Sequence, residues 1–495
     1  MIFRNIKISN YRDIRDGSIL VSTLVFSFIF LMIAGGLLGF VSQQRKLSLS
    51  RQAQLSALMI AEAGVNYYRW HLAHTPNDYA DGSGQTGCNP CGPYVHNFTD
   101  PSGTVLGSYS LLITPPPQGS TIVKIKSSGS SIANPSLQRH VVARYGRPSL
   151  AAYAVVADAN LRFGVGTTVH GPLHSNYGIR FDGLAYNVVS SYQNTYTDTD
   201  SDACTANSWG VHTCVSPADP SPNTPAQTRL DVFAAGRQYP VPQVDFNAIT
   251  VNLDQLQDLG NAADGSYFNP SNQQGWHIQF LGNGTYRYRK VKTTRTCTYG
   301  DPEVTVAVGD VYAYQGNWAT TALPANGIIF VEDNAWVDGT LQSGERITLV
   351  AAKEPLASGN ATIWVNNDIL YTVQDGTAAL GLIAQKDISV GLFSEDNLEI
   401  NAALLAQTGR VGRPYYPSAC SPSYYLRDTI TVYGSIATKQ RYGFAWVCGG
   451  APCSGYGVRN LNFDGTMTYT PPPSFPTSGE YRFISWEEVL SNEIY

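Results

Sequence analysis

Eight cysteines are the residues of this 495-residue chain with the clearest chemistry. In a chain that leaves the cytoplasm, an even number of cysteines indicates disulfides, and cysteines close in the sequence are the best local pairs. We expect Cys204–Cys214 and Cys448–Cys453, each closing a short loop, with Cys297–Cys420 as the remainder.

Cys88-Asn-Pro-Cys91 forms a CxxC, a spacing that elsewhere marks a redox or zinc site. A redox pair needs its first cysteine at a helix N-terminus, and Cys88 lies in a segment rich in Gly and Pro. A zinc site needs two more ligands, and the sequence has no second CxxC. We therefore predict a structural disulfide between Cys88 and Cys91, with metal binding and redox chemistry as alternatives.

Three alternate aspartates, Asp198, Asp200 and Asp202, resemble the start of a calcium-binding loop, because alternate carboxylates converge on one cation. Ala203 stands where such a loop needs its turn glycine, and Trp209 stands where it needs a bidentate glutamate. We expect a solvated acidic loop and no bound metal.

Catalytic fingerprints are absent from the sequence: no GxSxG, HExxH, Walker or GxGxxG pattern occurs in a suitable context. A polysaccharide-cleaving enzyme would need clustered carboxylates. The candidates are scattered, and such residues are common at turns. We expect no catalytic residue and no cofactor. A surface-anchored carbohydrate-active enzyme is the alternative, with candidate residues Asp333, Asp338, Asp368 and Asp387.

The one concentration of basic residues lies in the last hundred residues of the sequence, where tyrosines alternate with arginines. Such mixtures can stack on DNA bases and neutralise phosphates. The net charge of −5 opposes this interpretation. We predict surface decoration, and a ligand or DNA surface is the alternative. Its candidate residues are Arg410, Arg413, Tyr415, Tyr416, Arg427, Lys439 and Arg441.

The composition indicates which elements position these residues. Charged residues make up 14% of the chain, which also has 46 Gly and 30 Tyr, whereas soluble domains carry roughly 25% charged residues. This profile is typical of a β-rich exported protein. The balance of 32 basic and 37 acidic residues excludes a protein that mainly wraps nucleic acid, and the aromatic content excludes intrinsic disorder.

Residues 18–41 contain no ionisable side chain. At about 1.5 Å per residue they span about 36 Å, enough to cross a hydrocarbon core, and they are too long for a secretory signal peptide. Residues 43–72 continue with apolar residues at helical spacing, among them Leu55, and with small residues at Ala53, Ala57, Ala61 and Gly64. We predict one helix over residues 18–72 that spans a membrane with its first half.

The N-terminal region resembles the type IV pilin-like proteins, and within them the PilX-type minor pilins. The resemblance rests on a basic leader ending in Gly17, then Ser18, the uncharged helix, and AEAGVNYYRW at 61–70. It implies that a prepilin peptidase removes residues 1–17 and that the helix enters the inner membrane and then a pilus core. Major pilins carry Glu at the fifth mature position, and this chain has Ser22 there. An ordinary signal anchor is the alternative.

Two β regions follow the predicted helix. Residues 73–148 contain candidate strands at 105–114, 120–126 and 138–145. The pilin resemblance implies an antiparallel meander packed on the helix.

From residue 149 an eight-residue pattern occurs four times, at 169–176, 337–344, 400–407 and 432–439. Its alternate positions are aliphatic or small, which places them on one face of a strand and suits a narrow stack of coils. We predict a right-handed parallel β-helix over 149–460, with an insertion at 190–326 and a cap or tail at 461–495. A β-sandwich is the rival.

Residues 149–495 also resemble the C-terminal modules attached to PilX-like proteins of some bacteria, which brings no established activity. This resemblance lies in GPLHSN at 171–176, TAALGLIAQKDISV at 377–390 and RVGRPYYP at 410–417.

The predicted fold is therefore α+β: a long N-terminal helix with pilin-like antiparallel strands, followed by a mainly-β parallel β-helix. We expect a non-enzymatic minor pilin-like subunit of a type IV pilus or pseudopilus. It would cross the cytoplasmic membrane once, with its C-terminal region outside the cytoplasm or on the cell surface. Expected partners are other pilins, the pilus assembly machinery, prepilin peptidase and membrane lipid, with surface glycan or DNA as candidate ligands. DNA capture for competence is a further alternative.

Overall fold

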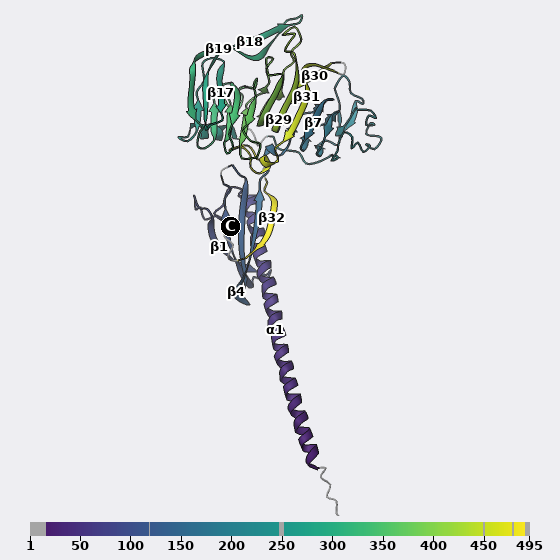
Figure 1. The fold of residues 1–495 in the computed structure, drawn as a ribbon, viewed down its shortest axis with the longest axis vertical. Coiled ribbons are helices and arrows are strands. Elements are labelled where there is room, and N and C mark those ends of the chain that lie inside the picture. Colours follow the sequence, from purple (N-terminus) through teal and green to yellow (C-terminus); the bar gives the residue numbers. More distant parts are fainter. Residues whose placement is uncertain (1–15, 118, 247–251, 449–450, 478–479, 491–495) are drawn as a thin grey trace, which may run out of the picture. The chain divides into compact units, whose positions relative to one another are not determined.

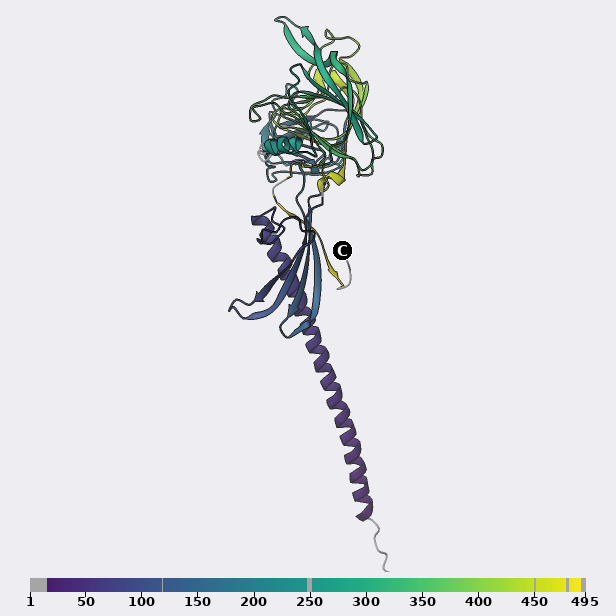
Figure 2. The ribbon, with the colours of Figure 1, turned by 90° about the vertical axis from the view of Figure 1, so that its left-hand side faces the viewer.

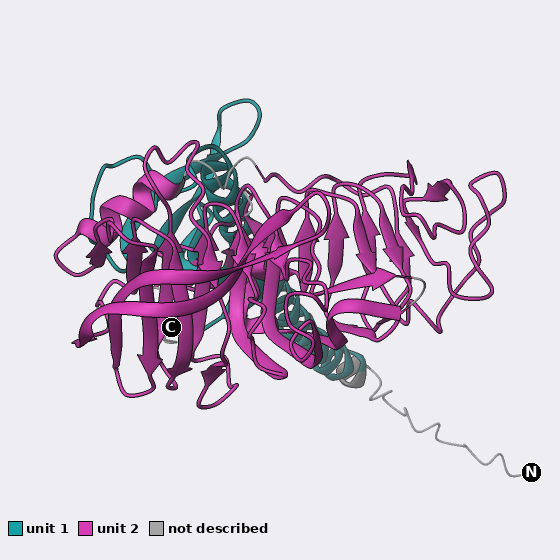
Figure 3. Ribbon diagram, turned by 90° about the horizontal axis from the view of Figure 1, so that it is seen from above, with its two compact units in different colours: residues 1–114, 124–143, 485–495 teal, residues 115–123, 144–484 magenta. Residues whose placement is uncertain are grey.

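The computed structural model describes residues 16–490 except 118, 247–251, 449–450 and 478–479. The chain divides into two compact units (Figure 3). Unit 1 comprises residues 1–114, 124–143 and 485–495, and unit 2 comprises residues 115–123 and 144–484. Most of the predicted leader, residues 1–15, lies outside the described residues.

Unit 1 begins with helix α1, Asp16–His74, which runs unbroken for 59 residues as the sequence predicts (Figure 1). Its first half exposes its apolar side chains: Phe26, Leu31 and Leu38 are 71%, 67% and 72% exposed. This helix is long and apolar enough to cross a membrane, and its most apolar stretch is not buried in the molecule. Its second half buries one stripe, which includes Tyr68 and Leu72. The two halves therefore face different surroundings.

An antiparallel sheet with strand order β1-β2-β3-β4-β32 completes unit 1. Figure 2 shows these strands beside the second half of α1. Buried and half-buried residues alternate along the central strands β2 and β3, which is the pattern of a sheet with one face on a core. The strands are β1 Cys91–Thr99, β2 Val105–Thr114, β3 Ile122–Ser131, β4 Asn134–Gly146 and β32 Arg482–Val489.

Small residues let α1 and the sheet approach closely. A Cβ atom at Gly129 of β3 would lie 2.3 Å from both the Ala57 carbonyl oxygen and the Ala61 nitrogen. The predicted stripe of small residues therefore faces the sheet. Leu55 differs from the expectation, because it is 63% exposed on the other side of the helix.

The C-terminal segment, predicted as a cap or tail of the solenoid, divides between two places. Met467 and Phe475 pack on the outside of the coils of unit 2. Strand β32 instead adjoins β4 in the sheet of unit 1, where Arg139 pairs with Glu488. The pairing covers the edge of β4, which would otherwise expose unpaired backbone groups.

Unit 2 is built on a stack of short parallel strands, the parallel β-helix that the sequence predicts (Figure 3). The stacked strands are β5 Val155–Ala157, β6 Leu161–Phe163, β7 Thr167–His170, β8 Leu173–Ser175, β9 Ile179–Phe181, β10 Leu184–Ala185, β11 Val189–Ser191, β14 Val211–His212, β15 Arg237–Gln238, β16 Ser266–Phe268, β17 Gly275–Leu281, β20 Ile328–Val331, β21 Ala335–Leu341, β22 Arg346–Ala351, β23 Ile363–Trp364, β24 Ile369–Tyr371, β25 Ala379–Ala384, β26 Ile388–Ser389, β27 Asn397–Ala406, β28 Val411–Gly412, β29 Leu426–Thr438 and β31 Ala451–Phe463.

Additional elements decorate the stack. They are the hairpin strands β12 Thr195–Thr197, β13 Asn207–Trp209, β18 Thr285–Tyr299, β19 Val304–Ala322 and β30 Ala445–Cys448, and the helices η1 Leu150–Ala152, α2 Asn252–Asn261 and η3 Gly465–Thr468.

Equivalent residues of successive coils form columns of inward-facing aliphatic side chains. Burial of each such side chain stabilises the fold by roughly 1.5–3 kcal/mol. One fully buried column runs through Val189, Leu173, Val155, Ile436, Leu404, Leu382, Leu349 and Ile329.

The coils do not follow one another in the order of the sequence. Val155 in the first strand of the stack pairs with Ile436 in β29, and Val169 in β7 pairs with Leu461 in β31. The coils from 266 to 463 are therefore continued in space by those from 155 to 238. We call this junction of the first and last coils the seam.

The predicted repeats match the observed register with one exception. Val432 pairs with Ile400, and Leu173 belongs to the column described above. The repeat at 337–344 is offset by two residues, because Gly339 rather than Val337 shares the column of Ile400 through Ile369.

The prediction of an insertion at 190–326 is only partly correct. Strands β11 and β15 extend the stack at one end, and β16 and β17 pair with β20 and β21 at the other. Strands β11, β15 and β16 are two or three residues long. Such short strands show no alternation that a sequence pattern could reveal.

One side of the stack is buried on both faces. Ala403 and Leu405 point away from the interior and belong to a second buried cluster, which also contains residues of α2 and Phe475. Strand β25 is buried at all six positions. This double burial explains its continuous apolar sequence.

The four predicted disulfides are all present: Cys88–Cys91, Cys204–Cys214, Cys297–Cys420 and Cys448–Cys453. Cys297 lies on hairpin strand β18, and Cys420 follows β28, so this bond ties the hairpin β18–β19 to the stack across 123 residues of sequence. Tyr416 and Leu392 pack around the same junction.

Replacing Gly129 by alanine should destabilise unit 1. The new methyl group would overlap backbone atoms of Ala57 and Ala61, and overpacking of this kind costs about 1–3 kcal/mol. Urea denaturation would measure the loss. Ser130→Ala, the next residue along β3, should change the free energy of unfolding by less than about 0.5 kcal/mol. Equal losses in both variants would contradict the close-approach account.

Removing the Cys297–Cys420 bond by a double serine substitution should lower the free energy of unfolding by about 2–5 kcal/mol, because the bond closes a long loop in the unfolded chain. The matched double variant of Cys88 and Cys91, which are three residues apart, should lose less. Urea denaturation of both variants tests this ordering, and the reverse order would refute it.

Candidate functional site

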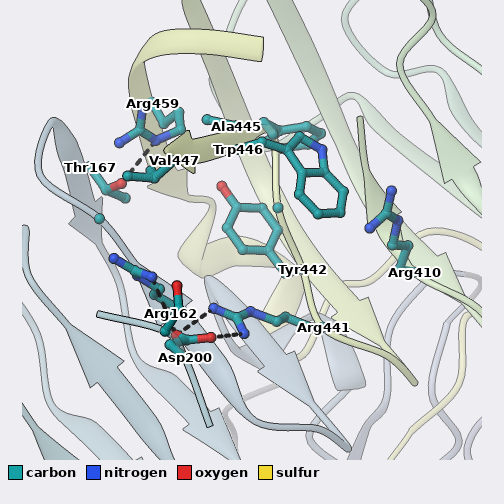
Figure 4. Close-up of a pocket in the computed structure, with 14 residues that line it drawn as sticks. Arg162, Thr167, Asp200, Arg410, Arg441, Tyr442, Ala445, Trp446, Val447 and Arg459 are labelled. Carbon is teal, nitrogen blue, oxygen red and sulfur yellow. Dashed lines mark hydrogen bonds and ion pairs between the residues drawn. The ribbon is translucent and has the colours of Figure 1, made fainter. Parts of the chain in front are cut away.

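A cavity of about 280 Å³ opens beside the seam of the solenoid (Figure 4). Its lining comes from the first coils, the last coils and the acidic loop between β12 and β13. We call it the arginine cavity, and its polar and aromatic lining residues are Arg162, Thr167, Asp200, Ser201, Arg410, Arg441, Tyr442, Phe444, Trp446 and Arg459.

Pairing across the seam brings these residues together. Thr167 of β7 lies opposite Arg459 of β31 in the parallel register, and Arg459 Nε donates to Thr167 Oγ1 at 3.1 Å. A parallel β-bridge pairs Gly412 with Gly443. It places the segment around Arg410 beside the segment that precedes β30. Residues far apart in the sequence therefore share one wall.

Two buried arginines keep their charge without a carboxylate partner in the described part of the chain. Arg459, one of the lining residues, also donates to three backbone carbonyl oxygens. Arg413, behind the cavity, is fully buried and donates to four. Burial lowers the pKa of the Arg459 guanidinium and lowers the pKa of Arg413 to about 10. Both groups are charged at neutral pH, and no anion neutralises them.

Arg410 and Trp446 form an exposed cation–aromatic pair. The guanidinium carbon of Arg410 lies 5.2 Å from the ring centroid of Trp446. Arg410 donates one long side-chain hydrogen bond, 3.4 Å, to the Arg413 carbonyl oxygen, and burial lowers the pKa of its guanidinium. Trp446 is 38% exposed, and its Nε1 donates to the same carbonyl oxygen. The pair presents spare donors beside an open ring face.

Asp200 is the one carboxylate in the lining. Both terminal nitrogens of Arg441 donate to it, at 2.7 and 2.9 Å. Arg162 lies 3.5 Å from Asp200 and donates to Asp202 at 2.6 Å. The four arginines of the lining therefore interact with three carboxylates, those of Asp200, Asp202 and Asp387, which leaves the arginines in excess.

Tyr442 lines the cavity, and its ring packs against Phe163 and Phe444. Figure 4 draws its ring between Trp446 and the guanidinium groups of Arg162 and Arg459. Tyr442 is 4% exposed, and its hydroxyl has no hydrogen-bond partner among the described residues. Burial raises the pKa of Tyr442, so the hydroxyl stays protonated and can donate. The Arg162 Nε is likewise buried and unpartnered within the described chain.

The structure divides the seven predicted surface residues. Arg410 and Arg441 line the arginine cavity, and Tyr415 meets Trp446 edge-on at 5.8 Å. The prediction of a surface position is wrong for Arg413 and Tyr416, which are fully buried. Arg413 is enclosed because the backbone carbonyls of two loops converge on its guanidinium, which its sequence neighbours do not reveal.

The other two predicted residues have structural partners. Lys439 lies 2.5 Å from Asp158 across the seam, and Arg427 lies 3.4 Å from Asp396. Sequence reasoning missed Arg162, Trp446 and the part that Asp200 plays. Finding them would have required knowing that the first coil stacks on the last.

The acidic loop faces cations of the protein itself. Arg180 Nε lies 2.8 Å from Asp182, and its Nη1 lies 3.1 Å from Asp202 and 3.9 Å from Asp198. A ring nitrogen of His212, the sulfur of Cys204 and the sulfur of Cys214 lie within 4.8 Å of one another. The sulfurs are joined in a disulfide, so they are not thiolate ligands.

The four candidate catalytic aspartates hold structural positions at the corners of coils. Asp333 accepts from the backbone nitrogen of Ser271, and Asp368 and Asp387 accept from the backbone nitrogens of residues 399 and 410. Asp338 pairs with His277 at 2.9 Å, and this pairing helps to hold the carboxyl's pKa low against the upward effect of burial.

Comparisons with known proteins assign neither the fold nor the function of this chain. No protein-family model matches the chain, and no curated protein matches it. A solved structure, the competence-associated pilin ComZ from Thermus thermophilus, is similar at 13% identity and a TM-score of 0.26, over 88% of this chain and 98% of that chain. A match at this level carries no argument about function.

Acid should weaken the ion-pair network of the cavity. The hydrogen bond from Arg162 holds the pKa of Asp202 below its ordinary value. The stabilisation is therefore present above the unfolded pKa, near pH 4, and is lost as the pH falls through the folded pKa. The thermal unfolding midpoint should decrease as the pH is lowered from about 4 to about 2, and the decrease should be smaller in Asp202→Asn. In the control Asp258→Asn, on the exposed side of α2, the midpoint should decrease as much as in the parent. A decrease in Asp202→Asn as large as in the parent would contradict this assignment.

Proposed function

We propose that this chain is a non-enzymatic, minor pilin-like subunit of a type IV pilus or pseudopilus. Helix α1 holds it in the cytoplasmic membrane, and the solenoid is displayed outside the cytoplasm for adhesion or assembly. The other pilins of the filament are the partners of the helix.

The apolar surface of α1 is the observation that carries this proposal. A simple membrane anchor needs about 20 apolar residues. In this helix the exposed apolar surface continues into the half that carries the sheet, where Leu47, Leu55 and Met59 are 52%, 63% and 64% exposed. The extra surface suits contacts with neighbouring helices in a filament, which a solitary anchor would not need.

The cysteines support a location outside the cytoplasm. All cysteines of the described chain are in disulfides, and none is free. Disulfides form and persist in oxidising compartments. Display of the solenoid beyond the membrane is consistent with this chemistry.

Processing of the full chain tests the proposal. Expressed with a prepilin peptidase, the chain should be recovered in the membrane fraction with an N-terminal peptide that begins at Ser18, measured by mass spectrometry. Gly17→Val should block cleavage. Gly39→Ala, whose methyl group would meet no atom within 4 Å, should be processed normally. A mature N-terminus at Met1, or recovery in the soluble fraction, would rule out the pilin role.

A further inference from the structure

The arginine cavity contains donor groups that the fold leaves unused. The Tyr442 hydroxyl and the Arg162 Nε are buried without partners among the described residues. Arg410 uses its guanidinium for one long hydrogen bond and one aromatic contact. A buried donor without an acceptor is costly. These three groups leave donor capacity beside the cavity for an acceptor supplied from outside the chain.

The charge of the cavity selects an anion. Four arginines face the carboxylates of Asp200, Asp202 and Asp387, and Arg413 adds a further charge with no carboxylate partner among the described residues. In a half-enclosed site such charges are weakly screened. A carboxylate is a favourable occupant because a guanidinium can donate two parallel hydrogen bonds to it.

The remaining lining selects a sugar acid over a phosphate. A phosphodiester offers acceptors only, so it has no group that can donate to the Asp200 carboxylate. A sugar acid has hydroxyls that can donate to Asp200 and a carboxylate that can accept from Arg410 and Tyr442. The exposed ring of Trp446 provides an apolar platform for the face of a pyranose.

The size of the cavity favours a single sugar ring over a nucleic-acid strand as its occupant. Its volume of about 280 Å³ lies at the lower end of the range for small-ligand sites, roughly 300–1,000 Å³. Single-stranded nucleic acids need a basic groove with several stacking rings, over about 4–16 nucleotides per domain. The lining offers one exposed indole, Trp446, beside the buried Tyr442.

We propose that the arginine cavity binds a uronate residue of an acidic polysaccharide. The inference names the ligand class for the display role proposed above and rests on that role. Arg410 and Tyr442 bind the carboxylate, Asp200 accepts from the sugar hydroxyls, and Trp446 packs on the ring.

Calorimetric titration of the full chain in detergent micelles tests the proposal with three probes: a short oligogalacturonate, the neutral oligogalactoside of equal length, and a single-stranded oligothymidylate. We expect binding of the oligogalacturonate alone. Arg410→Gln should weaken this binding by about tenfold or more, as expected for a lost charge-assisted hydrogen bond. Binding of the neutral sugar with equal affinity, or of the oligonucleotide in an Arg410-dependent way, would overturn the proposal, as would absence of oligogalacturonate binding.

Two further variants separate ligand binding from structure. Tyr442→Phe should weaken binding by about tenfold while the thermal unfolding midpoint stays the same or rises, because a buried unpaired hydroxyl is removed. Gly443→Leu should abolish binding, since a Cβ atom there meets nothing closer than 3.9 Å and the larger side chain fills the cavity. Arg295→Gln, the same charge change on the distant hairpin β18–β19, should bind like the parent. Unchanged binding in Tyr442→Phe and Gly443→Leu would overturn the assignment.

The sugar-binding experiment and the processing experiment can fail independently. Loss of oligogalacturonate binding with normal cleavage at Gly17 would remove the ligand and leave the pilin role. Binding by a chain that is neither cleaved nor held in the membrane would remove the pilin role and leave the sugar site.

Discussion

The solenoid depends on the pairing of its first coil with its last. Val155 pairs with Ile436, and Val169 pairs with Leu461. Without these contacts the aliphatic column would end at two exposed strand edges, each able to pair with another chain. The two sides of the seam are distant in sequence: Lys439 and Asp158, which form an ion pair across it, are 281 residues apart. The entropy of closing so long a loop rises only with the logarithm of its length, so a buried core can offset it.

The seam also explains why the polar chemistry gathers where it does. Within a coil, inward positions are aliphatic and backbone groups pair with the next coil. At the seam, loops of unequal length from both ends of the module meet, and their carbonyl oxygens are satisfied by arginines. Arg459 does this across the seam, where its guanidinium binds the carbonyls of Val165 and Gly457, whereas Arg413 binds carbonyls of two loops within the last coils. A lysine ammonium could not bind several carbonyls in the same geometry. The charges of these two arginines are left without anions, and the positive potential of the cavity follows from this structural use of arginine.

The sequence allowed the architecture to be predicted better than the site. An uncharged run followed by small residues at helical spacing specified α1, and alternation at 400–407 and 432–439 specified stacked strands. These signals are local. The insertion at 190–326 was misjudged because β11, β15 and β16 are too short to alternate. The cavity was only partly found because Arg162 and Trp446 meet through a junction that no local pattern encodes, whereas Arg410 and Arg441 lie within one basic segment.

The course of the chain shows how a large module can be added to a small unit made of one helix and one sheet. Strands β4 and β32 are neighbours in the sheet of unit 1, and the chain between them, residues 147–481, belongs to unit 2. The solenoid is thus inserted within one sheet connection and does not simply follow the sheet as a tail. The close contact of Ala57 and Ala61 with Gly129 involves only unit 1, and the exposed apolar side of α1 lies on the other surface of the helix. An insertion at this position can grow or change its surface without altering the exposed apolar surface of α1.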